Sequence, residues 1–354
     1  MNMGAGSADR GALIGGGAVA GHDARDAVHP LARLASLRLT LAVLLALGAG
    51  ILFSYDADTA SAWWIAAPLS IGAVNLGAAI VFNQRFRRQT PLLAFHIALL
   101  ALVVLFACGR LSYFRGQVEL AEGETFAGEM AQMANVRQGP LHAGNLGSVK
   151  FVNDGFSIRY APGLRRAETQ NRVRVGPALD SRVIGDIDPL IAEGYRFYTS
   201  FNKGFALMFT WIPADGSLPV RGAVHLPSYP IHEFEQAMEW TPPGMREPIW
   251  CLLRFDKPPL DETREAFFQK PAADVRHDVV LRAGTVRHEL TAGQSQSFAE
   301  GVLRYDGLST WMGYEVFYDW TIPWLLAACL MAVLCLAWHF ARAFRANPWD
   351  APSP

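Results

Sequence analysis

The stretch Pro91–Gly109, PLLAFHIALLALVVLFACG, is an apolar run without acidic or basic side chains other than His96, and it ends at Arg110. At about 1.5 Å per residue, a helix of this length is just long enough to cross the hydrocarbon core of a bilayer. His96 lies about a turn and a half after Pro91. An ionisable group at that depth costs free energy unless it is paired, solvated or acting as a ligand. His96 is therefore the first candidate functional residue.

The composition indicates a membrane protein. Of the 354 residues, 51% are hydrophobic and 18% are charged, and the charged share is below the roughly one quarter that is usual for a soluble protein. The apolar residues gather in separate runs. The formal net charge of −1 gives no overall attraction to nucleic acid, so no nucleic-acid partner is predicted.

Three further apolar runs predict three more membrane helices. They are Leu39–Tyr55, Thr59–Gln84 and Trp320–Ala341. The sequence thus predicts a membrane α+β protein with four transmembrane helices and a large β-rich extracytoplasmic domain between the third and the fourth. The predicted divisions are a disordered cytoplasmic tail (1–30), a membrane domain (31–111), a periplasmic β-rich domain (112–318), a fourth transmembrane helix (319–342) and a cytoplasmic tail (343–354).

Flanking charges predict the orientation. The Arg85–Arg88 segment and Arg342 with Arg345 mark cytoplasmic ends under the positive-inside rule, while Asp56 and Asp58 face outside. Both termini are then cytoplasmic. In a bacterial cell the large domain lies in the periplasm, and the lipid bilayer that holds the chain is the inner membrane.

The region after Arg110 has the composition of a β-rich domain. Aromatic and β-branched residues alternate with Gly, Asn and Asp, which favours an antiparallel sandwich or sheet assembly. Asn153-Asp154-Gly155 and Asn202-Lys203-Gly204 predict tight turns. One helical patch is predicted near Ile231–Trp240.

No catalytic motif is present. The sequence contains no GxSxG, HExxH or GxxxxGK[ST], so no catalytic residue is predicted. The extramembrane Cys251 has no external partner for an internal disulfide. His339, in the fourth run, is the second candidate for cofactor binding beside His96, because neutral imidazole is a common axial ligand of haem iron. Alternative roles are a helix-packing hydrogen bond for His96 and interfacial anchoring for His339.

The order of these parts resembles the ResB (CcsB) component of the System II cytochrome c maturation complex. The matching stretches are Leu34–Leu47 (LASLRLTLAVLLAL), the third run with its histidine, Gly116–Phe126 (GQVELAEGETF) and Gly313–Pro323 (GYEVFYDWTIP). The resemblance covers nearly the whole chain from about residue 31.

This resemblance implies a function. Family members work with a second membrane protein of the ResC (CcsA) type, which carries a Trp-rich external haem-handling motif. Together they move haem b across the membrane and present it to CxxCH motifs of apocytochrome c. The resemblance implies that His96 ligates the haem iron, and that this chain, which has no Trp-rich motif of its own, is a non-autonomous subunit of a cytochrome c synthetase (haem lyase).

Two other classes of function remain open from the residues alone. One is a non-catalytic membrane scaffold or chaperone for the assembly of a respiratory complex. The other is a membrane-tethered external sensor. His96 discriminates between the classes, because neither a scaffold nor a sensor needs an imidazole within the membrane.

Overall fold

Four long apolar helices and a large β-rich region make up the computed structural model, which describes residues 33–55, 61–176, 180–271 and 275–346. The predicted tail at residues 1–30 and the turn with Asp56 and Asp58 lie outside the described residues. The helices are α1 (Leu37–Tyr55), α2 (Trp63–Phe82), the short α3 (Gln84–Arg88), α4 (Thr90–Ser112) and α5 (Ile322–Ala346).

The four long helices can each cross a bilayer by length and composition. Large apolar side chains cover their outer surfaces, with Leu41, Leu52 and Leu334 all well exposed. In water such a surface would be unfavourable, whereas lipid tails solvate it. The prediction of a membrane α+β protein is therefore confirmed at this level.

Asn75 of α2 is a buried polar side chain in the helix bundle. Its amide nitrogen donates to the carbonyl oxygens of Leu34 (2.5 Å) and Ser36 (3.1 Å), and its amide oxygen accepts from the Thr40 hydroxyl (2.7 Å). These bonds give the buried amide of Asn75 its own partners at the start of α1, as a polar group among apolar side chains requires. Asn75 thereby fixes α2 against α1.

Sixteen strands follow α4 in the described part of the chain. They are β1 (Phe114–Ala121), β2 (Thr125–Phe126), β3 (Met133–Gln138), β4 (Phe151–Ala161), β5 (Arg165–Val175), β6 (Asp180–Ile184), β7 (Leu190–Ala192), β8 (Tyr195–Pro213), β9 (Val220–His225), β10 (Ala237–Trp240), β11 (Ile249–Phe255), β12 (Ala266–Gln269), β13 (His277–Ala283), β14 (Val286–Leu290), β15 (Ser295–Phe298) and β16 (Gly301–Tyr318).

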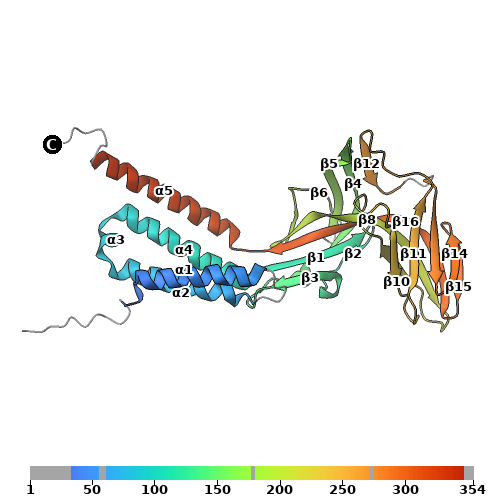
Figure 1. Ribbon diagram of the computed structural model, residues 1–354, viewed down its shortest axis with the longest axis horizontal. Helices are drawn as coiled ribbons and strands as arrows, with labels where there is room; N and C mark the ends of the chain where they lie inside the picture. Colours follow the sequence, from blue (N-terminus) through green and yellow to red (C-terminus); the bar gives the residue numbers. More distant parts are fainter. Residues whose placement is uncertain (1–32, 56–60, 177–179, 272–274, 347–354) are drawn as a thin grey trace, which may run out of the picture.

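The strands form three antiparallel sheets. One has the order β3-β1-β16-β8-β7, with β15 on β16 and β9 on β8; the second is β12-β4-β5-β6, with β2 on β4; the third is β10-β11-β13-β14. The long strands β8 and β16 pair along their whole length, from Tyr195 opposite Tyr318 to Pro213 opposite Gly301. Figure 1 shows β1 and β16 extending from the ends of α4 and α5 into the β region.

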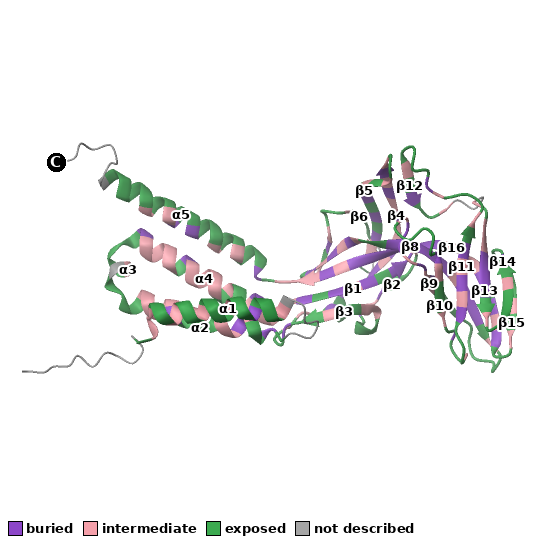
Figure 2. Cartoon of the chain, viewed as in Figure 1, coloured by how far each residue is buried: buried purple, intermediate pink, exposed green. Residues whose placement is uncertain are grey.

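An aromatic core holds the sheets together. Its largest fully buried side chains include Phe114, Phe151, Trp211, Tyr305 and Tyr314. Burying each such ring contributes about 1.5–3 kcal/mol relative to leaving it in water. Buried positions run along the central strands, and exposed ones dominate the helices (Figure 2).

Three local predictions differ from the structure. The Asn153–Gly155 and Asn202–Gly204 segments are not hairpin turns but lie inside β4 and β8, next to register shifts. Gly155 has a φ of +94°. The positive φ that a tight turn would require therefore occurs at a β-bulge instead. The expected helix near Ile231–Trp240 is also wrong, because its second half forms strand β10.

Candidate functional site

His96 lies near the beginning of α4, and its ring nitrogens have different roles. Nδ1 lies 2.7 Å from the carbonyl oxygen of Leu92, one turn earlier. Because a carbonyl oxygen only accepts hydrogen bonds, Nδ1 must carry the proton. In the neutral ring Nε2 then keeps its lone pair, and no hydrogen bond to it is found within the described residues. This tautomer is the one that presents Nε2 to a metal ion.

Aromatic rings hold the imidazole of His96 on two sides. The Phe86 ring of α3 stacks on it, with centroids 4.0 Å apart and an interplanar angle of 28°. Phe95 approaches edge-on at 5.4 Å. The sequence predicted the histidine but missed Phe86, which stands in the polar segment QRFRR and becomes a neighbour only because α3 folds back against α4. The one sequence feature that pointed to Phe86 was its position as a single aromatic residue within a basic segment.

His339 lies on α5 and is partly exposed. Its ring contacts Phe340 edge-on, with centroids 5.6 Å apart. At about 1.5 Å per residue, His339 and His96 both lie about 25 Å from the helix ends that meet the β region. The two candidate residues therefore occupy similar depths on neighbouring helices.

The structure does not bring the two histidines together. No hydrogen bond or ring contact joins them in the part of the chain that is described. An apolar cavity of about 730 Å³ is lined by both α4 and α5, with Ala98 and Ala101 on the first helix and Ala328 on the second. At about 100° per residue, His96 falls on the face of α4 turned away from this cavity.

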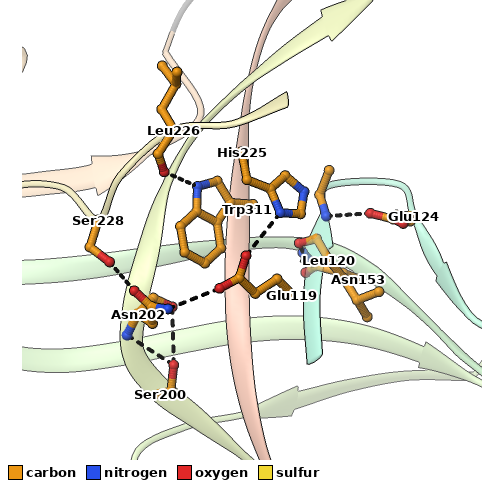
Figure 3. Close-up of polar contacts among 11 residues, drawn as sticks. Glu119, Leu120, Glu124, Asn153, Ser200, Asn202, His225, Leu226, Ser228 and Trp311 are labelled. Atoms are coloured by element: carbon orange, nitrogen blue, oxygen red, sulfur yellow. Dashed lines mark hydrogen bonds and ion pairs between the residues drawn. The ribbon is translucent and has the colours of Figure 1, made fainter. Parts of the chain in front are cut away.

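A second cluster of polar side chains lies in the β region, where four strands meet (Figure 3). Glu119 of β1 accepts hydrogen bonds from Nδ1 of His225 (3.3 Å) and from the Asn202 amide (3.0 Å). The His225 ring stacks on Trp311, with centroids 5.2 Å apart and an interplanar angle of 8°. The indole nitrogen of Trp311 donates to the Leu226 carbonyl oxygen at 3.0 Å.

This second cluster orients an imidazole, since Glu119 fixes the proton on Nδ1 and Trp311 fixes the ring plane. The sequence did not pair them: Glu119 and His225 are 106 positions apart, and only Glu119 lies in a stretch that resembles the family, Gly116–Phe126. Neither here nor elsewhere in the described residues is a group of three or more His, Cys, Asp and Glu side chains placed to hold a metal ion.

Comparison with known proteins places the chain in a family. Among solved structures, a chain described as "Cytochrome c Heme Lyase CcmF" is similar at 15% identity and a TM-score of 0.26, covering 85% of this chain and 34% of that one. The present chain thus spans about a third of that protein's length. No curated protein matches. The model of the ResB-like family matches residues 83–345, a range that contains α3, α4, the whole β region and both candidate histidines, and the chain belongs to the ResB-like family.

Proposed function

We propose that this protein is the ResB-like subunit of a membrane complex that matures c-type cytochromes, exporting haem and presenting it for ligation to apocytochrome c. Family membership supports a role in cytochrome c biogenesis in general. The observation that carries the specific proposal is the lone pair on Nε2 of His96, held inside a membrane helix and without a hydrogen-bond partner among the described residues.

The orientation that we propose puts the β region in the periplasm and both termini in the cytoplasm. Arg87 and Arg88 of α3 lie at the same end of the bundle as Arg342 and Arg345 of α5, remote from the β region (Figure 1). Basic residues that gather at one end favour the cytoplasmic side. At the opposite end Trp63, Trp320 and Trp324 are exposed, as in an interfacial aromatic belt.

His96 fits the role of a haem ligand. The bond from Nδ1 to the Leu92 carbonyl and the stacked Phe86 ring fix the direction of Nε2, and apolar surroundings suit the flat body of haem b. Bound there, the haem iron would take its axial ligand from His96, which offsets the cost of placing imidazole in the membrane.

The second axial ligand is expected from a ResC (CcsA)-type partner. His339 lies at a similar depth, but His96 faces away from the space between α4 and α5, so the two rings do not converge. A partner helix could reach Nε2 of His96 without displacing α5. We therefore propose that His339 is not the main second axial ligand, and that the complex tolerates its loss.

The test compares His96→Ala with His339→Ala in the complex purified with its partner. We expect His96→Ala to remove the haem absorption bands and abolish holocytochrome c formation, while the membrane level of the protein is unchanged. Added imidazole should restore part of both signals by filling the vacated position. His339→Ala should retain most of each signal. Normal haem spectra and normal cytochrome c levels in His96→Ala would refute ligation and favour the scaffold function.

A further inference from the structure

A cavity of about 620 Å³ lies where the membrane helices meet the β region. Apolar side chains of α2, α4 and α5 line one part of it, among them Leu69, Phe106 and Leu325. Strands β1, β8 and β16 contribute Arg115, Arg196 and the aromatic side chains between them. The cavity is therefore amphipathic, with an apolar side towards the helices and a cationic side towards the sheet.

The cationic side has a regular arrangement. Arg115, Phe317 and Arg196 lie directly opposite one another on three neighbouring strands, so their side chains share one face of the sheet. The Arg115 guanidinium lies over the Phe317 ring at 5.3 Å and 3.5 Å from the Glu315 carboxylate. Arg110 enters from α4, with its guanidinium 4.8 Å from the centre of the Tyr113 ring.

Among the described residues, two of these three guanidinium groups have no carboxylate partner. Nε of Arg110 is buried without a hydrogen-bond acceptor, and no ion pair or hydrogen bond of Arg196 is found within the described residues. Asp319 also lines the cavity; its Oδ1 accepts from the backbone nitrogen (2.9 Å) and hydroxyl (2.7 Å) of Thr321, and no ion pair joins it to Arg110 or Arg196 within the described residues. Partly desolvated cations of this kind are stabilised by an anionic ligand, and guanidinium binds carboxylate in two-point geometry.

We propose that this cavity binds a dianionic amphiphile with a flat apolar body and two carboxylates. Resting on the proposed function, this ligand is haem on the extracytoplasmic side of the membrane, with its carboxylates on Arg110 and Arg196 and its ring system against Phe106 and Phe317. The two uncommitted positive charges match the two negative charges of the ligand. A phospholipid headgroup with a single net charge leaves one guanidinium unpaired.

Recognition at this cavity does not depend on iron. None of its lining residues is a His, Cys or Met. The neighbouring His142 uses both ring nitrogens, towards the Ser112 carbonyl oxygen (3.0 Å) and the Tyr195 hydroxyl (2.7 Å). An iron-free porphyrin with two carboxylates should therefore bind here, whereas it has no metal for His96 to ligate. This difference separates the two sites experimentally.

The experiment measures binding of protoporphyrin IX, by fluorescence, to the full chain in nanodiscs of neutral lipid. We expect the free diacid to bind at least tenfold more tightly than its dimethyl ester. The double variant Arg110→Gln, Arg196→Gln should lose at least tenfold in affinity for the diacid. Arg287→Gln, a change on the exposed face of β14, should bind like wild type.

Equal binding of the diacid and the ester to the wild-type protein would overturn the proposal, and this comparison does not depend on the folding of any variant. Unchanged affinity in the double variant would also overturn it. Displacement of the porphyrin by phosphatidylglycerol, with arginine-dependent retention of that lipid, would assign the cavity to a phospholipid instead. The haem spectrum of His96→Ala is a separate measurement. Porphyrin binding at the cavity can therefore be refuted while the proposed function stands, and the proposed function can be refuted while the cavity still binds porphyrin.

Discussion

Lys203 gives the sharpest test of the β region, because it is a buried cation. Its side chain lies inside β8 with 2% exposure, and its ammonium donates to the Phe201 carbonyl oxygen at 3.0 Å. Burial and, to a smaller extent, the nearby Arg166 lower the pKa of Lys203 from 10.5 to about 8, with Asp186 opposing the change. A pKa difference of this size corresponds to about 3 kcal/mol of unfavourable free energy for the charged form.

The direction of the pH dependence follows from the two pKa values. Below pH 8 the lysine is charged in both the folded and the unfolded chain, and the folded state bears the full cost. Between about pH 8 and 10.5 the folded lysine loses its proton while the unfolded one keeps it, so this residue's contribution to the free energy of unfolding rises with pH. Above 10.5 both forms are neutral and the contribution is constant.

The perturbation is Lys203→Met, which keeps a side chain of similar length and removes the charge. At pH 7 we expect the variant to be more stable by about 2 kcal/mol, since relief of about 3 kcal/mol is partly offset by the lost hydrogen bond of about 1 kcal/mol. Thermal unfolding of the full chain in detergent, from pH 7 to 10.5, measures the difference, with Lys270→Met on the exposed surface as control. The difference should shrink as pH rises. A constant difference, or no gain at pH 7, would refute the reasoning.

Two further predictions concern buried groups of the same region. Tyr314→Phe leaves the amide oxygen of Asn171, now 2.9 Å from the Tyr314 hydroxyl, without that donor, and should lower the free energy of unfolding by about 1–3 kcal/mol in denaturant titrations; an unchanged midpoint would contradict this. Cys251 is fully buried, and burial raises the pKa of its thiol to about 12, so Cys251→Ser should leave cytochrome c formation intact and the native thiol should resist maleimide. Lost cytochrome at a normal protein level would reveal a redox role for this cysteine.

The membrane helices were predictable because their signal is local. A run of apolar residues long enough to cross a bilayer has few alternatives, and Pro91 at the first turn of α4 starts the helix without losing a backbone bond. The short helix α3 was not predictable in the same way. Its five residues are polar or basic apart from Phe86, and its position depends on packing against α4.

The strand order and the bulges depend on contacts that are distant in the sequence. Asn153 and Gly155 carry the residue types of a tight turn, yet β4 continues through them because β5 pairs on both sides of the irregularity. The Asn153 side chain then bonds the Leu120 carbonyl oxygen, and Asn171 bonds Asn153 in turn. Local sequence shows the need for a special backbone conformation but not whether a turn or a bulge will meet it.

The candidate sites also differ in whether local sequence reveals them or only contacts between distant residues do. His96 stands out in the sequence because its neighbours make it anomalous, and its ligand role stays a prediction. The Glu119–His225 pair and the arginines of the junction cavity could not be found from the sequence, because each set is assembled from elements that are far apart along the chain. Arg115 and Arg196 become neighbours only through Phe317 on the strand between them.

The connection between the sheet and the membrane helices decides which parts of the bundle can adjust. Strand β1 begins two residues after α4 ends, and β16 ends four residues before α5 begins. Phe114 and Tyr318 are paired at that point, and the Trp320 indole donates to the Ser112 hydroxyl at 2.8 Å. The ladder therefore fixes the spacing of α4 and α5 where the junction cavity lies. No strand of the described residues joins these two helices at the depth of His96, so the β1–β16 pairing does not fix their spacing there.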